Sequence, residues 1–202
     1  VMNIHINTQN AVKTVYGIDI QYYDTTEEVS GVEFYMTEDG ISTGRVNNIS
    51  TIAKSCSKLI NKGCEAIAIV CYFGEDSEDE NYANAKGIDP IGGIEAVLSH
   101  LITEKFKIPA AHAPAFESID ISEKLEHPKV SSEMISSTYL PCIMQGLSVA
   151  PYIFKNNKGK IKNKDIEYLI IPYDAIGNPA VLSSYENGVK IAAVKNKTVL
   201  NV

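Results

Sequence analysis

The sequence lacks tryptophan, any long apolar run and any dense basic segment outside residues 155–164. Its longest uncharged apolar stretch, residues 66–73, is far shorter than the roughly 20 residues that cross a bilayer, so we expect no membrane partner. Acidic residues outnumber basic ones by 25 to 18, and the resulting net charge of −7 argues against a nucleic-acid partner. The first residues show neither a basic flank nor a small-residue cleavage site. We therefore expect no signal peptide and a cytoplasmic protein.

Cysteine and histidine are scarce, which bears on metal and redox chemistry. The four cysteines are Cys56, Cys64, Cys71 and Cys142. None forms a CxxC pair, no Cys/His cluster has the spacing of a zinc site, and in a cytoplasm we expect reduced thiols. His112 is the only histidine with a supporting context. We predict no metal site, and leave open a carboxylate-assisted one that includes Asp89 or Asp174.

What is present is the composition of an ordinary globular protein, with 45% apolar and 21% charged residues in a chain of 202. That length suits a single domain, 1–202. Apolar spacing predicts helices over residues 3–16 and 48–62, from residue 92 onward, and over 179–186. Apolar runs predict strands near 18–24, 65–72, 108–116, 139–144, 168–173 and 189–194, and Asp39-Gly40 predicts a hairpin over 33–46. This alternation predicts a three-layer α/β fold, a mostly parallel sheet with helices on both faces.

Ligands of such folds bind beyond the carboxyl ends of the strands, which selects four candidate catalytic residues. His112 is predicted in a loop that follows a strand end and is stiffened by Pro109 and Pro114, where it can act as an acid or base near neutral pH. Cys71 and Cys142 end two apolar runs. As a facing pair of thiols they could remove and return an α-proton, and otherwise they are small core residues. Asp174 follows a strand, where it could be a general base or a turn residue.

Five further residues are candidates for substrate binding. Gly92 and Gly93 begin a helix whose N–H groups could hold an anion, or they allow tight packing between a helix and a strand. Arg45 is the only arginine and could clamp a carboxylate or phosphate, or lie solvated on the surface. Asn178 and Asn196 follow two of the predicted strands and could line the same sheet edge. The spacing around Gly92 matches neither common nucleotide-binding motif, and no cofactor is indicated.

Several long segments occur together in an order that resembles a known family. They are GIDPIGGIEAVLSHLITEKFKIPAAHAPAF at 87–116, TYLPCIMQGLSVAP at 138–151, YLIIPYDAIGNPAVLSS at 168–184 and AVKNKTVLNV at 193–202. They resemble the family called domain of unknown function 3326. The resemblance implies that the chain is the C-terminal portion of a longer or split protein, and it implies no activity. Cys71 and the loop 173–178 depart from the pattern expected of the family.

These observations favour a cytosolic enzyme, or a subunit of one, that acts on a small anionic metabolite carrying a carboxylate or phosphate. Proton transfer next to a carboxylate, as in a racemase, isomerase or lyase, is the reaction class that the residue types suggest. One alternative is a metabolite-binding or regulatory domain without chemistry. Another is a structural subunit that forms a homo-oligomer or is completed by an N-terminal partner segment.

Overall fold

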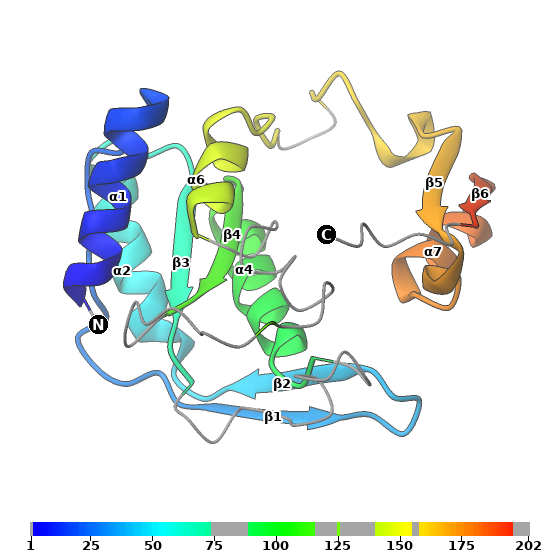
Figure 1. Cartoon of the computed structure of the whole chain (residues 1–202), viewed down its shortest axis with the longest axis horizontal. Helices are drawn as coiled ribbons and strands as arrows, with labels where there is room; N and C mark the ends of the chain where they lie inside the picture. The colour runs from blue at the N-terminus through cyan, green and yellow to red at the C-terminus, as the bar shows by residue number, and fades with distance from the viewer. Residues whose placement is uncertain (1, 74–88, 116–124, 126–139, 155–157, 196–202) are drawn as a thin grey trace. The chain divides into compact units, whose positions relative to one another are not determined.

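The computed structural model describes residues 2–73, 89–115, 125, 140–154 and 158–195 (Figure 1). The chain forms two compact units, residues 1–153 and residues 154–202, and we describe each by itself. The single domain predicted from the sequence stays a prediction. The mixed α/β class is confirmed, because helices alternate with both parallel and antiparallel strand pairs.

The first unit opens with helix α1 (Met2–Tyr16), which ends where Gly17 adopts a positive φ of 66°. The predicted hairpin follows as β1 (Val32–Met36) and β2 (Ser42–Val46), paired antiparallel across a turn at Gly40. Helix α2 (Ile49–Asn61) then buries the stripe that its apolar spacing predicts, and Gly63 ends it with a φ of 99°. These three predictions depend on local turn and helix signals, and the structure confirms them.

Strands β3 (Ile67–Cys71) and β4 (Ala110–Pro114) form a parallel pair, connected through helix α4 (Gly92–Phe106). Figure 1 shows the two strands side by side with α4 and α2 behind them. Apolar side chains from these elements make the core of the unit. The buried residues of this core are Ile52, Cys56, Ile67, Cys71, Leu98 and Ile102. The burial of each large side chain in such a cluster stabilises the fold by about 2 kcal/mol.

Two elements of this unit differ from their predictions. Residues 18–24 form no strand, and the chain that follows them is held on α2, where Ser55 Oγ donates to the Thr25 carbonyl at 3.0 Å. A strand was predicted over residues 139–144, but the described part of that segment, residues 140–144, belongs to helix α6 (Leu140–Ser148). The apolar residues there also fit a helical period, and Pro141 is tolerated in the first helical turn, so a short apolar run was ambiguous.

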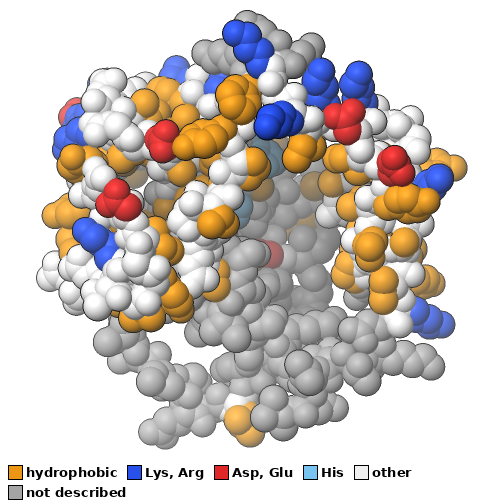
Figure 2. Space-filling model, turned by 90° about the horizontal axis from the view of Figure 1, so that it is seen from above, with side chains coloured by type: hydrophobic (Ala, Val, Ile, Leu, Met, Phe, Trp, Pro, Cys, Tyr) orange, Lys and Arg blue, Asp and Glu red, His pale blue; other side chains and the backbone are white. Residues whose placement is uncertain are grey.

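The second unit repeats the strand–helix–strand pattern. Strands β5 (Tyr168–Pro172) and β6 (Lys190–Val194) are parallel, and they are connected through the short 3-10 helix η3 (Tyr173–Ala175) and helix α7 (Pro179–Glu186). A further 3-10 turn, η2 (Asn163–Asp165), precedes β5. Ile171 and Val181 form its buried side, whereas Tyr168 and Ile170 are exposed. Apolar side chains are interspersed with charged ones on the face of the molecule drawn in Figure 2.

Candidate functional site

The candidate site is built on one face of the β3–β4 pair. Because side chains alternate along a strand, His112 faces the same side as Pro114, and the register places Ile69 and Cys71 beside them on β3. His112 was predicted in a loop; it lies in the middle of β4 instead. The stretch between Pro109 and Pro114 forms a strand because Ala110 and its neighbours pair with β3 along their whole length.

The partner of His112 is a serine on α4. Ser99 Oγ lies 3.0 Å from His112 Nδ1, and the Ser99 side chain is only 4% exposed. Ser99 Oγ also lies 3.2 Å from the Ala96 carbonyl and 3.4 Å from the Glu95 carbonyl, to which it can donate. This hydrogen bond holds the imidazole against the helix through Nδ1, and no described residue partners Nε2.

Glu95 lies one helical turn before Ser99, on the same face of α4. Its side chain is 3% exposed, and within the described part of the chain its Oε1 has no hydrogen-bond partner. Burial raises the pKa of Glu95 to about 7, and the negative charge of Asp89 adds to the rise. The site therefore contains a carboxyl group that is partly protonated near neutral pH.

Burial and nearby charges also shift the pKa values of His112 and Cys71. Burial lowers the pKa of His112, as does the positive charge of His100, whereas Asp89 opposes this. Burial raises the pKa of Cys71 to about 12, and the charge of Glu95 contributes. Cys71 therefore stays a thiol at neutral pH, which does not support a role as thiolate base or nucleophile.

The paired-thiol arrangement depended on two strand ends, and Cys142 is at neither. It lies on α6, where it lines an open surface depression of about 520 Å³ together with Tyr16 and Ile18 near the end of α1. On the neighbouring strand β4, the ionisable side chain on the same face as Cys71 is His112, which contacts Ser99 on α4. The structure therefore provides no second thiol opposite Cys71 at the carboxyl end of β4.

The glycine pair at the start of α4 packs closely against its neighbours. A Cβ on Gly93 would lie 1.9 Å from the Ser42 carbonyl oxygen, and a Cβ on Gly92 would lie 2.8 Å from Asp89 Oδ2. The Gly93 N–H donates to Ser42 Oγ at 3.2 Å, and the Ile91 N–H donates to Asp89 Oδ1 at 2.9 Å. These contacts support the packing interpretation of the glycines, and their anion-binding role stays a prediction.

The remaining predicted residues lie outside this constellation. Arg45 is exposed on β2, opposite Glu33, on the strand face away from Gly44 and α4. Asn178 belongs to the second unit, where its side chain caps α7 by accepting from the Ala180 N–H at 2.8 Å. Asp174 is part of η3, but its side chain lies outside the described part of the chain, as does the whole of Asn196. Their roles in ligand binding stay predictions.

Glu95 and Ser99 are not among the site residues predicted from the sequence. The apolar residues of this helix include Val97 and Leu101, whereas its buried face contains Glu95 and Ser99 next to Ile94, Leu98 and Ile102. Leu101 is 38% exposed. The available signal was a carboxylate and a hydroxyl at i and i+4, directly beside the apolar row. Among the described residues, no group of three or more histidine, cysteine or acidic side chains could hold a metal ion.

The structure defines the chain as a mixed α/β protein, and comparisons with known proteins identify its family. It belongs to the family described as "Protein of unknown function (DUF3326)", whose model matches residues 1–202. The match confirms the resemblance and does not bear out the expectation that the chain is only a C-terminal portion. No solved structure matches the chain.

A curated relative corrects the expected location. The chain is 30% identical over 205 aligned positions to a Synechococcus sp. protein named "Uncharacterized lipoprotein", covering 98% of this chain and 57% of that protein. The chain thus spans little more than half of the relative's length. A lipoprotein relative points to membrane anchoring, so the cytoplasmic location predicted from the sequence is wrong. None of the described helices is both long and apolar enough to span a bilayer.

Proposed function

We propose that this chain is an enzyme, or a subunit of one, that transfers a proton next to the carboxylate of a small metabolite, with His112 as its acid–base group. The observation on which this proposal depends is the 3.0 Å hydrogen bond between Ser99 Oγ and His112 Nδ1. Two features of the surroundings support it. The imidazole is half-buried and has a lowered pKa, so it is neutral and able to accept a proton at neutral pH.

Ser99 suits both directions of proton transfer. When its hydroxyl donates to a backbone carbonyl of α4, its oxygen accepts from Nδ1–H, and Nε2 carries the lone pair of a base. Once Nε2 has taken a proton, both ring nitrogens carry protons, so Nδ1–H still donates to Ser99 Oγ and Nε2–H is the acid that returns the proton. Ser99 is thus a positioning residue in this proposal, and His112 is the catalytic residue.

The proposed step removes a proton from the carbon next to the carboxylate and returns a proton to it. Nε2 of His112 takes the proton on the carbon next to the carboxylate, and the electron pair of that C–H bond is delocalised into the carboxylate. A proton then returns to the same carbon, on the same face or the opposite one. The three-layer, mostly parallel fold belongs to this proposal, and the parallel pairs β3–β4 and β5–β6 support it. The name of the Synechococcus relative supports an anchored location for the activity.

Deuterium incorporation tests this proposal without knowledge of the natural substrate. The full chain is incubated in D2O with a panel of α-amino and α-hydroxy acids, and loss of the α-proton signal is followed by NMR. We expect exchange in at least one compound, with a loss of about 100-fold or more in His112→Ala. Ser99→Ala should lower the rate less and shift its pH profile, because it removes the hydrogen bond to Nδ1 but leaves Nε2 of His112 in place.

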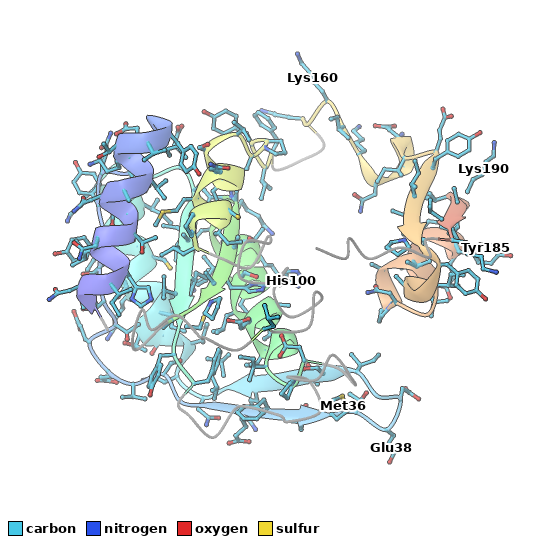
Figure 3. The ribbon with its side chains drawn as sticks, viewed as in Figure 1. Met36, Glu38, His100, Lys160, Tyr185 and Lys190 are labelled. Carbon is cyan, nitrogen blue, oxygen red and sulfur yellow. The ribbon has the colours of Figure 1, made fainter. Side chains whose placement is uncertain are left out.

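His100→Ala is the matched control. His100 is the other histidine near the site, and it projects outward from α4, where it is exposed (Figure 3). We expect this variant to keep the exchange rate apart from a small shift of its pH profile. A wild-type protein that exchanges no compound of the panel, or a His112→Ala variant that exchanges as fast as wild type, would contradict the proposal. Thermal stabilisation by a ligand without exchange would support the binding-domain alternative.

A further inference from the structure

The carboxyl group of Glu95 is a buried group that the proton transfer from His112 does not use. Its side chain is 97% buried, and Oε1 has no hydrogen-bond partner among the described residues. A buried carboxyl oxygen without a partner costs free energy that folding alone does not recover. A ligand that donates a hydrogen bond to Oε1 would remove that cost.

The position of Glu95 connects it to the proton-transfer site. Glu95 and Ser99 are four residues apart on α4, which places neighbouring side chains about 5–6 Å apart at Cβ. Ser99 in turn contacts the His112 ring at 3.0 Å. Glu95 also acts electrostatically on Cys71, which shares the sheet face of His112. The inference requires a small ligand bound at His112 Nε2 to extend along this face as far as Glu95.

The charge around Glu95 selects the kind of donor. In the described part of the chain, the charged group that acts on Glu95 is Asp89, another carboxylate. His112, which contacts Ser99 one turn along the same helix, has a pKa that burial lowers, so it adds no positive charge at neutral pH. This local excess of negative charge favours a cationic donor over a neutral one, because a charge-assisted hydrogen bond is about twice as strong.

We propose that the substrate carries a protonated amine that donates to Glu95, so that the site takes α-amino acids in preference to the α-hydroxy acids of the same shape. The inference rests on the proposed function and names its substrate class. An ammonium group offers three donors and a positive charge, whereas a hydroxyl offers one donor and no charge. Sites that are built to pair with a substrate group reject the analogue that lacks it, because their own buried group is then left unpaired.

The test uses matched pairs of ligands in the same exchange experiment. Alanine is compared with lactate, and glutamate with 2-hydroxyglutarate, on the full chain. We expect the amino acid of at least one pair to exchange about tenfold faster than its hydroxy partner, a difference of about 1.4 kcal/mol. In Glu95→Gln the amide oxygen still accepts a hydrogen bond but carries no charge, so the ratio should fall towards one.

Glu104→Gln is the matched control, since Glu104 lies exposed on the same helix. It should keep the wild-type ratio. A thermal-shift measurement with the same pairs reports binding independently of turnover, and circular dichroism shows that each variant is folded. Stabilisation by the amino acid but not by its hydroxy partner, lost in Glu95→Gln, would support the inference.

The outcomes separate the inference from the function on which it rests. Exchange of hydroxy acids as fast as amino acids, or a ratio unchanged in Glu95→Gln, would overturn the amine contact and leave the proton-transfer function in place. Absence of exchange and of stabilisation with every compound would overturn both.

Discussion

At the scale of single residues, Glu95 is a carboxyl group buried in the first unit. Its side chain is 3% exposed, and burial raises its pKa to about 7 with a further contribution from Asp89. In the unfolded chain the same group titrates near its ordinary value of about 4.3. Between these two values the folded state holds a proton that the unfolded state has lost. Stability from this group is therefore complete at low pH and falls as pH rises through the folded pKa.

Glu95→Gln isolates this effect. We expect the free energy of unfolding of the variant, relative to wild type, to increase by about 2–3 kcal/mol from about pH 5 to about pH 8. The amide keeps the shape of the side chain but does not ionise. Urea unfolding at a series of pH values measures the difference, and Glu104→Gln is the exposed control. His112, with its lowered pKa, changes stability in the opposite direction, but it is common to both proteins and cancels. Parallel curves for variant and wild type would show that Glu95 does not titrate in this range.

The thiols give a second prediction at this scale. Burial raises the pKa of Cys71 to about 12, with a contribution from Glu95, and that of Cys56 to about 11. Because only thiolates react with iodoacetamide, both should be labelled in the native protein far more slowly than Cys64, which is partly exposed. Mass spectrometry of digested protein measures each rate. Fast labelling of Cys71 with an apparent pKa below about 8.5 would restore the thiol mechanism.

At the scale of elements, the contact between α4 and β2 sets the position of the site. Gly93 allows this contact, because a Cβ at that position would lie 1.9 Å from the Ser42 carbonyl oxygen and close to the Thr43 nitrogen. Ser42 Oγ completes the contact by donating to the Pro90 carbonyl at 2.9 Å. The helix that carries Glu95 and Ser99 is thus anchored by its first turn.

Gly93→Ala should disrupt that anchor. The methyl group would collide with backbone atoms that cannot rotate away, so we expect a loss of about 3 kcal/mol in the free energy of unfolding. Gly146→Ala is the matched control. Gly146 is also helical, in α6, but a Cβ there meets no atom within 4 Å. That variant should gain up to about 1 kcal/mol from helix propensity. Equal effects of the two substitutions on the urea midpoint would contradict this account of Gly93.

At the scale of the whole molecule, net charge is the property with a measurable consequence. With 18 basic and 25 acidic residues, the chain carries −7 at neutral pH. Repulsion among charges of the same sign destabilises a compact state, and dissolved salt screens that repulsion. The described ion pairs of Lys58 with Asp24 and Glu27 lie at the surface, where such pairs contribute little to stability. Screening of the repulsion should therefore outweigh screening of these pairs.

We therefore expect the melting temperature to rise when sodium chloride is increased from about 0.05 M to about 0.5 M at pH 8. Differential scanning calorimetry measures the shift. Lys58→Met removes both ion pairs and should leave the salt response in place. A melting temperature that falls with salt would show that attractive surface pairs dominate over the net charge.

The sequence by itself determined the elements whose signals are local. The Asp39-Gly40 turn sets the hairpin, the apolar stripe before Gly63 sets α2, and β-branched runs set β3 and β5. Turn chemistry and periodicity act within a few residues, so no tertiary information is needed to read them. They were sufficient to assign the α/β class and to single out His112.

Only the tertiary structure decided what surrounds His112. The face of α4 that is buried depends on β2 and β4 packing against it, and this packing buries Glu95 and Ser99 while it leaves Leu101 exposed. The short apolar run at 139–144 fits a helix or a strand, and the packing of residues 140–148 against β3, β4 and α1 selects the helix that carries Cys142. Ser99 meets His112 because two strands and a helix assemble in space, a contact that no local pattern specifies.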